Sequence, residues 1–531
     1  MMKITALAAA VSVALLAGCC GTAQNTAKAA SAELNGNKYT ESWDDLAQVN
    51  EQPDWFQDAK LGIYAHWGPV STANIDHDPG AGWYGMNMYM EDSYDWSTGK
   101  VKMKNGKPVK NQVFARNKEL NGDPKDFGYK DMIKRFNPTA FNPQEWADLF
   151  AKSGAKFAGP VAMHHDNFAM WDADSTRWNV KDMHGIDVVG ELKKAIEAKD
   201  MKFLTSFHHA FTWVYYAQAY KYDATEADSD LYTDKHDLTD FHPTQRFHEE
   251  WFAKLKEVVD NYQPDVVWFD WWVEELEEEW RKKFIAYYYN KGAEWGKDVV
   301  ISYKNTSFPA EVGVHDYERG RPNQTKEKFW MTDTSPGAWF FRQNAKFVEP
   351  NEIVDILIDI VSKNGLMLLN VPPNPDGSIP PVMKDMLTKL GDWLKINGEG
   401  IYGTRPWKSF GEGPTRIKAG GHKVEKQKIV YTNKDIRFTK KGDDTVYMFV
   451  MDKPTSDIKV KTLGTDITLL DGDIASVEML GSDQKVEWSR NTDALTIKKP
   501  ASVPNDFAVG YKIKLKLAKE VGIGGDDDPG A

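Results

Sequence analysis

The sequence predicts an α/β protein in which a (β/α)8, TIM-like barrel is followed by a C-terminal antiparallel β-sandwich. Short apolar runs alternate with segments of helical periodicity over residues 41–404. From residue 405 to residue 517 the pattern changes to short alternating runs separated by turn residues. The 531 residues exceed one ordinary domain, and a hydrophobic content of 41% is enough to build large cores.

Residues 1–18 are predicted to form a lipoprotein signal peptide. An early lysine precedes an apolar stretch, 4–17, that is too short to span a membrane comfortably. The sequence LAGC then resembles a bacterial lipobox, which would make Cys19 the lipidated first residue; an ordinary signal peptide cut near Ala23 is the alternative. Cys20 stands where inner-membrane retention requires Asp. The expected location is therefore an outer-membrane lipoprotein, or the periplasm, of a Gram-negative bacterium.

Residues 19–40 are rich in Ala, Asn, Thr, Ser and Gly and predict a flexible tether. Because both cysteines of the chain precede the folded body, disulfides, thiol chemistry and cysteine-based zinc sites are excluded there. A net charge of −12 disfavours nucleic acid and anionic membrane surfaces as partners, although a local basic groove remains compatible with it. We expect membrane association only through the lipid anchor, and the sequence does not indicate an oligomeric state.

The barrel strands are predicted from nearly continuous apolar runs, because parallel strands covered on both faces lose polar alternation. The clear runs are 61–67, 156–165, 202–209, 265–272, 298–304 and 365–371, with weaker ones near 314–318 and 329–333. Helices are predicted at 143–153, 186–199, 244–261, 275–290, 350–363 and 381–396. Roughly eight such strand–helix units predict a closed barrel.

The sandwich, residues 405–517, is predicted from short segments with alternating polarity. These segments are 444–451, 456–463, 466–470, 474–480, 485–488 and 494–498. The sandwich would either brace the barrel or bind carbohydrate. The remaining residues, 518–531, contain GGDDDPGA and are predicted to be disordered.

Reactive side chains stand at the carboxyl ends of five predicted strands, where barrel enzymes place their catalytic groups. The ends are His66-Trp67-Gly68, His164-His165-Asp166, His208-His209, Trp268-Phe269-Asp270-Trp271-Trp272 and Asp316-Tyr317-Glu318. Asp270 is a carboxylate inside an apolar, aromatic strand. Burial of an unpaired charge is costly, so Asp270 requires either a functional role or a salt bridge.

The histidines admit two interpretations. Together with Asp270 they could bind a metal, as in amidohydrolase barrels, but such sites usually need an H-x-H pair on the first strand, which offers only His66. Imidazoles also exchange hydrogen bonds with sugar hydroxyls, and the 20 Trp and 21 Tyr suit sugar stacking as well as core packing. We therefore expect a sugar pocket with no metal and no cofactor.

Several long motifs resemble glycoside hydrolase family 29, the α-L-fucosidases. They are WFQDAKLGIYAHWG, FNPQEWADLFAKSGAKFAGPVAMHHDNFAMWDADSTRWN, PDVVWFDWW, NGLMLLNVPPNPDGSIP with WLKINGEGIYGTRPW, and KDIRFTKKGDDTVYMFVM with MLGSDQKVEW. The resemblance spans about 41–517. It implies a retaining exo-hydrolase that removes terminal α-L-fucosyl residues from glycans or oligosaccharides through a covalent glycosyl-enzyme intermediate.

The resemblance also implies roles for individual residues. Asp270 falls on the nucleophile of the family's W-x-D strand, and Glu318, in HDYERGRP, falls on the acid/base of one subgroup. Residues that match the sugar pocket are His66, Trp83, Tyr84, His164, His165, His208 and Trp268. In another subgroup the acid lies about three residues later, where this chain has Arg321. The other carboxylates considered for this role are Glu274, Glu275 and Glu311.

One departure from the family concerns the residue before Trp83. The family places a pocket Glu there, and this chain has Gly82, so a hydroxyl contact is lost or supplied elsewhere. This departure leaves two alternatives open: a hydrolase for a sugar related to fucose, or a non-catalytic glycan-binding lipoprotein on the same fold. Turnover of an activated aryl fucoside that Asp270→Ala blocks would exclude the second. Insensitivity to chelators would exclude a metal hydrolase.

Overall fold

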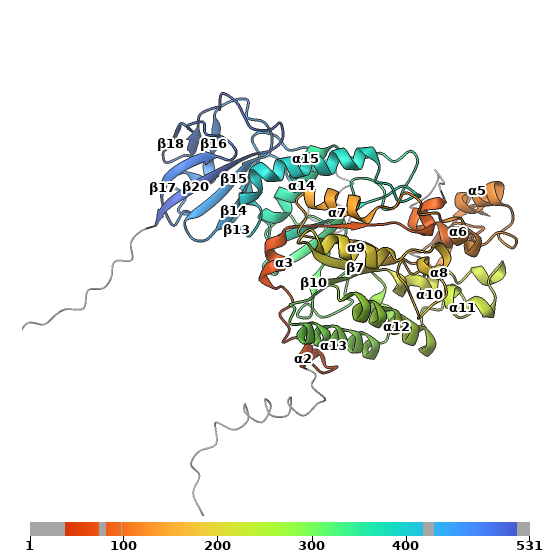
Figure 1. The fold of residues 1–531 in the computed structure, drawn as a ribbon. Coiled ribbons are helices and arrows are strands. Elements are labelled where there is room, and N and C mark those ends of the chain that lie inside the picture. The colour runs from red at the N-terminus through yellow and green to blue at the C-terminus, as the bar shows by residue number, and fades with distance from the viewer. Residues whose placement is uncertain (1–37, 74–80, 97, 418–428, 518–531) are drawn as a thin grey trace, which may run out of the picture.

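The computed structural model describes residues 38–73, 81–96, 98–417 and 429–517. The predicted signal peptide, the lipidation site Cys19, most of the predicted tether and the predicted tail 518–531 lie outside the described residues. Figure 1 shows two bodies, a large one coloured red to cyan and a smaller one in blue. Within the described residues, no helix combines the length and the apolarity that a membrane crossing requires.

The larger body is a parallel barrel of eight strands in the order β10-β9-β8-β7-β6-β1-β12-β11. The strands are β1 (Leu61–Ala65), β6 (Phe157–Met163), β7 (Lys202–Phe207), β8 (Val266–Phe269), β9 (Val300–Tyr303), β10 (Val314–His315), β11 (Trp330–Thr334) and β12 (Gly365–Val371). A parallel bridge between Asp316 and Met331 joins the two ends of the sheet. The predicted fold class is confirmed, and all eight predicted strands are present.

The helices cover the outside of this barrel (Figure 1). The six predicted helices are α7 (Pro143–Lys152), α9 (Val188–Glu197), α12 (Gln245–Tyr262), α13 (Glu278–Trp295), α14 (Pro350–Ser362) and α15 (Pro381–Asn397). The others are α2 (Trp43–Leu46), α3 (Asp54–Ala59), α4 (Tyr84–Asn87), α5 (Gln112–Asn121), α6 (Tyr129–Arg135), α8 (Val180–His184), α10 (Thr212–Tyr215) and α11 (Ser229–Tyr232). In the described residues 304–329, loops replace the helices that would separate β9, β10 and β11.

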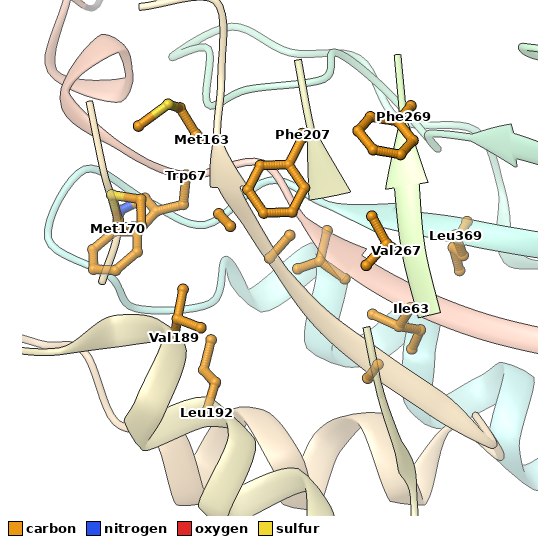
Figure 2. Close-up of a cluster of buried hydrophobic side chains, with 14 of the residues drawn as sticks. Ile63, Trp67, Met163, Met170, Val189, Leu192, Phe207, Val267, Phe269 and Leu369 are labelled. Carbon is orange, nitrogen blue, oxygen red and sulfur yellow. The ribbon is translucent and has the colours of Figure 1, made fainter. Parts of the chain in front are cut away.

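Both faces of the barrel strands are buried, which explains their continuous apolar sequence. In β8, Val266 and Trp268 belong to the core inside the barrel, whereas Val267 and Phe269 belong to the core under the helices. Figure 2 shows this outer core, with Ile63, Phe207 and Leu369 of neighbouring strands and Val189 and Leu192 of α9. A strand of such composition fits only a sheet covered on both sides.

The smaller body contains two antiparallel sheets packed around a core of their own. One has the order β13 (Arg405–Glu412), β14 (Ile436–Lys441), β15 (Thr445–Val450), β20 (Val509–Leu517), β17 (Gly472–Met479), and the other β16 (Ile458–Val460), β19 (Leu495–Ile497), β18 (Trp488–Arg490). The predicted strand at 466–470 is wrong: no strand pairs with these residues, and Ile467 is 41% exposed. β13 and β14 were not among the predicted segments.

A buried ionic cluster joins the two bodies. Asp359 of α14 accepts hydrogen bonds from Arg437 of β14 at 2.7 Å and from Lys363 at 2.8 Å. Burial would raise the pKa of Asp359, but the positive charges of Lys363 and Arg437 outweigh it and lower the pKa. Trp393 of α15 also donates to the carbonyl oxygen of Ala508 at 2.8 Å. The sandwich is therefore fixed against the α14 side of the barrel.

Candidate active site

The carboxyl ends of the barrel strands bring seven polar side chains to one rim. Parallel strands end at the same edge, so residues far apart in sequence meet there. The residues, each at or just after a strand end, are His66, His164, His165, His208, Asp270, Lys304 and Glu318. Of these, Lys304 was not singled out from the sequence, although it ends the predicted strand 298–304.

Lys304 is the centre of a buried charge cluster. Its Nζ lies 2.9 Å from Asp270 Oδ1, 3.2 Å from Glu318 Oε2 and 3.2 Å from Asp333 Oδ2. Burial would lower the pKa of Lys304, but the charges of Asp270, Asp333 and Glu318 outweigh it and hold the pKa well above its ordinary value. The ammonium group stays charged and stabilises the carboxylates around it.

The shared ammonium group sets the spacing between Asp270 and Glu318. The two carboxylate oxygens bind the same Nζ, and the tetrahedral spread of its N–H bonds would place them about 5 Å apart. Retaining glycosidases hold their two carboxyl groups roughly 5–5.5 Å apart, whereas inverting enzymes need about 6.5–9.5 Å. The pair is therefore compatible with a retaining mechanism.

Asp333 and Asp316 form a second carboxylate pair beside this cluster. Asp316 Oδ1 accepts from the Asp333 backbone N–H at 2.8 Å, and Asp316 Oδ2 accepts from Trp268 Nε1 at 2.5 Å. Tyr64 donates to Asp333 Oδ2 at 2.9 Å. Burial, reinforced by the charge of Asp316, raises the pKa of Asp333 well above its ordinary value.

Hydrogen bonds fix the tautomers of two histidines. The Asn370 amide donates to Ser335 Oγ and to the Trp339 carbonyl, so its Oδ1 accepts from His66 Nδ1 at 2.9 Å. His66 Nε2 then carries no proton in the neutral ring and accepts from His208 Nε2 at 3.2 Å. Burial lowers the pKa of His66 to about 3 and that of His208 well below its ordinary value, so both rings are neutral.

His165 faces the nucleophile candidate. Its Nδ1 donates to the His208 carbonyl oxygen at 2.7 Å, and its Nε2 lies 3.5 Å from Asp270 Oδ2. Burial lowers the pKa of His165, so the neutral ring offers Nε2 as an acceptor for a sugar hydroxyl. The Trp83 ring lies 5.7 Å from His165 and 6.2 Å from Trp271, on the same side of the site.

Trp268 and His164 complete the site. The Trp268 side chain is fully buried, and its ring centroid lies 5.0 Å from that of His208. Lys304 Nζ lies 4.9 Å from the centroid of the Trp268 ring. His164 lies 4.4 Å from His208 and 4.8 Å from Phe340 between ring centroids. Among these four histidines His164 is the most exposed, since the other three are buried.

Some predicted residues do not join the cluster. Tyr84 is 1% exposed and its hydroxyl donates to Asn117 at 2.5 Å, so its role is in packing rather than in the sugar pocket. Asp166 accepts from Tyr129 at 2.6 Å. The ring of His209 stacks on Trp251 of α12, outside the barrel. The sequence could not separate these three residues from the site, because each of them adjoins a residue whose side chain does face the rim.

The other carboxylates considered for proton transfer have different surroundings. Glu274 accepts from Asn305 at 2.8 Å and from Ser307 at 2.9 Å. Glu311 forms an exposed ion pair with Lys328 at 2.9 Å, and Glu275 is exposed. Arg321 lines a cavity against the sandwich rather than the rim cluster. Of the acid/base candidates, Glu318 alone has a described contact with the ammonium group that binds Asp270.

Three imidazoles have the spacing of a metal site. One ligand nitrogen from each of His66, His164 and His208 lies within 4.8 Å of the others. The residue types fit Zn²⁺, but the hydrogen bond between His66 and His208 would have to break, because the Nε2–H of His208 occupies the lone pair of His66. The hydrogen bonds of the described residues thus account for this pair without an ion.

Replacing Lys304 by methionine is expected to destabilise the fold by about 3–5 kcal/mol and to reduce kcat about 10²-fold or more. The change leaves Asp270, Glu318 and Asp333 close together without a cation. Urea unfolding and aryl-fucoside kinetics measure the two effects. Lys254→Met is the matched control, since Lys254 is similarly buried but donates to the Asn167 amide oxygen at 2.9 Å, rather than to a carboxylate. Wild-type kcat in Lys304→Met would contradict the central role of this lysine.

Comparisons with known proteins agree over nearly the whole chain. A family profile described as "Alpha-L-fucosidase" matches residues 26–399, and one described as "Alpha-L-fucosidase C-terminal domain" matches residues 428–518. The chain is 28% identical to the tissue alpha-L-fucosidase of Rattus norvegicus, over 92% of this chain and 96% of that relative. It is also 28% identical to the alpha-L-fucosidase of Branchiostoma floridae, over 90% and 96% of the two chains.

Solved structures show the same fold. The Thermotoga maritima alpha-fucosidase in complex with fucose has a TM-score of 0.68 at 24% identity, covering 90% of this chain and 100% of that one. An alpha-L-fucosidase of Bacteroides thetaiotaomicron, solved as a trapped covalent intermediate, has a TM-score of 0.59 at 19% identity, covering 87% and 96%. Both structures show that the barrel with the polar rim has a fold already known from solved structures.

Proposed function

The chain belongs to the α-L-fucosidase family, and on this premise we propose that Asp270 and Glu318 hydrolyse terminal α-L-fucosyl bonds with retention. The chain is a glycoside hydrolase, and its substrate is a fucosylated glycan or oligosaccharide. The observation that carries the assignment of residues is the shared ion pair: both carboxylates bind Lys304, at 2.9 and 3.2 Å. Two oxygens that bind one nitrogen at these distances lie no more than about 6.1 Å apart, which is less than an inverting reaction needs and supports a double displacement.

In the first step an Asp270 oxygen attacks the anomeric carbon, while Glu318 gives its proton to the departing glycosidic oxygen. The C–O bond to the leaving group breaks, and an ester bond to Asp270 forms. In the second step Glu318 takes a proton from water, whose oxygen attacks the same carbon from the opposite face and releases Asp270. Lys304 stabilises whichever carboxylate is charged at each stage.

The histidines and tryptophans bind the sugar in this scheme. His165 offers a neutral ring whose Nε2 lies 3.5 Å from Asp270 Oδ2. The neutral ring of His208 packs against those of His164 and His165, and His164 is the least buried of the three. Trp83 provides a flat apolar face next to His165. Neutral imidazoles suit hydroxyl groups, because one ring nitrogen donates and the other accepts.

An aryl-glycoside panel followed by NMR tests the proposed function. The protein is expected to hydrolyse 4-nitrophenyl α-L-fucoside faster than the corresponding galactoside, and the first-formed sugar should be the α-anomer. Initial release of the β-anomer would exclude retention. Faster turnover of another glycoside would show that the enzyme prefers a different sugar. It would not contradict the proposed roles of the two carboxylates.

Gly82→Ala is expected to raise KM for the aryl fucoside about tenfold with little change in kcat, because overpacking costs about 1–3 kcal/mol. A Cβ at Gly82 would lie 3.0 Å from His164 Cε1 and 3.3 Å from Phe340 Cε2. Steady-state kinetics measure the effect. The control is Gly68→Ala, whose Cβ would make only an ordinary contact with Met170 at 3.7 Å. An unchanged KM in Gly82→Ala would show that His164 does not contact the sugar.

Export as a lipoprotein remains a separate proposal, supported by the LAGC sequence that ends at Cys19. Labelling with radioactive palmitate in the producing cell tests it. The label should appear on the wild-type protein and disappear in Cys19→Ala. A labelled Cys19→Ala variant, or an unlabelled wild type, would refute lipidation at this residue.

A further inference from the structure

A cavity lies between the barrel and the sandwich, and Arg319, the residue after Glu318, lines it. It has a volume of about 410 Å³, within the range of small-ligand sites. Its lining includes residues 319 and 321 after β10, the last residue of β11 with the loop that follows it (334–337), the first turns of α14 and Tyr431 of the sandwich body. The cavity is therefore built by both bodies.

Arg321 is the notable side chain of this cavity. It is 7% exposed, yet within the described part of the chain its guanidinium group makes no hydrogen bond or ion pair. A guanidinium group carries five N–H donors, and the described residues accept from none of those of Arg321, so they are free to bind a ligand in the cavity. The planar fork of these donors matches a carboxylate or a sulfate, each of which can accept two parallel hydrogen bonds.

The acidic groups near Arg321 do not neutralise it. Asp359 is bound by Lys363 and Arg437 at 2.8 and 2.7 Å. Burial raises the pKa of Asp355 to about 8 in spite of the opposing charge of Arg321, so this carboxyl group is largely protonated at neutral pH. Glu352 also lines the cavity, but three basic residues line it as well: Arg319, Arg321 and Lys346. The balance of charge favours an anion.

The remaining lining suits a sugar ring. Ile353, Ile356, Ile429 and Tyr431 give the cavity an apolar side, against which the C–H face of a pyranose can pack. Arg319 lies between this cavity and the catalytic rim. It donates to the Gly337 carbonyl oxygen at 2.8 Å, and its guanidinium carbon lies 4.5 Å from the centroid of the Trp339 ring. Trp339 in turn lies 5.3 Å from His66. One layer of side chains thus separates the cavity from the sugar pocket.

We propose that this cavity binds an acidic sugar, a pyranose that carries a carboxylate or a sulfate, through bidentate hydrogen bonds from Arg321. The site goes beyond hydrolysis of the fucosyl bond and requires no turnover. It supplies the local basic surface that the net charge of −12 does not reveal.

Isothermal titration of the whole protein with D-glucuronate and with D-glucose 6-sulfate tests the proposal, and the methyl ester of glucuronate serves as the uncharged control. At least one of the two acids should bind, and the ester should bind at least about tenfold more weakly. Binding of the carboxylate sugar, the sulfate sugar or both identifies the anion. Binding of neither, or equal binding of the ester, would overturn the proposal.

Variants locate the bound sugar. Arg321→Met should weaken binding about tenfold or more and Arg321→Lys by less, whereas Lys346→Met, which removes an exposed charge of the same cavity, should change it by no more than about twofold. Binding of the acidic sugar should be unchanged in the Asp270→Ala variant, and it should also be unchanged when L-fucose is present at a saturating concentration. Displacement by fucose, or wild-type binding in Arg321→Met, would overturn the proposal without affecting the hydrolase assignment. If Arg321→Met fails to fold, Arg321→Lys and the ester comparison decide the question.

Discussion

Asp270→Ala is expected to lower kcat for an aryl α-L-fucoside by about 10⁴-fold or more, with fucose binding largely retained. The carboxylate is the only group that we assign to attack on the anomeric carbon. Steady-state kinetics and fucose titration measure the two quantities. Because Lys304 would lose one of its carboxylates, a melting curve should accompany both measurements.

Azide gives this prediction a chemical control. In Asp270→Ala a small anion can enter the space of the lost carboxylate and attack the anomeric carbon from the same face. Azide should therefore restore turnover of an activated substrate and yield the β-fucosyl azide. Restored turnover with an α-azide product, or wild-type kcat in the variant, would refute the assignment of Asp270.

Glu318→Ala should produce an effect that depends on the leaving group. For a fucosylated oligosaccharide, whose leaving oxygen needs a proton, kcat is expected to fall about 10³-fold. For a dinitrophenyl fucoside, which departs without protonation, the first step should be nearly unaffected. The ratio of the two losses, measured in parallel, reports general acid catalysis separately from any structural damage.

Glu274→Ala is the matched control for this variant. Glu274 follows Asp270 by four positions in the sequence, but its hydrogen-bond partners are Asn305 and Ser307 rather than Lys304. It should show no dependence on the leaving group. If Glu274→Ala showed that dependence and Glu318→Ala did not, the proton donor would have to be reassigned to Glu274.

The barrel was predictable because its strands are apolar on both faces and end in reactive residues. The same pattern predicts that His66, His165 and Asp270 lie at one rim, which is where the strand ends of the structure bring them. The sandwich was less predictable. A short apolar run at 466–470 resembles a strand, and β13 does not, because it is partly polar and carries a register shift between Pro406 and Gly411.

Lys304 and Asp333 show why part of the site was not predictable. A lysine at the end of a strand is usually a solvated residue, and nothing in its local sequence indicates that three carboxylates surround it. Their convergence depends on barrel closure, through the bridge between Asp316 and Met331. Tyr84 shows the opposite case: its neighbour Trp83 faces the rim, while its own side chain turns toward Asn117.

The most direct test of the mechanism is to trap the covalent intermediate. An activated 2-deoxy-2-fluoro-fucosyl fluoride reacts with the nucleophile, and the fluorine at C2 then slows hydrolysis of the ester. Mass spectrometry of a peptic digest locates the added sugar. We predict that it is attached to Asp270 and that Asp270→Ala remains unlabelled. Attachment to Glu318 or Asp333 instead would contradict the account of this site.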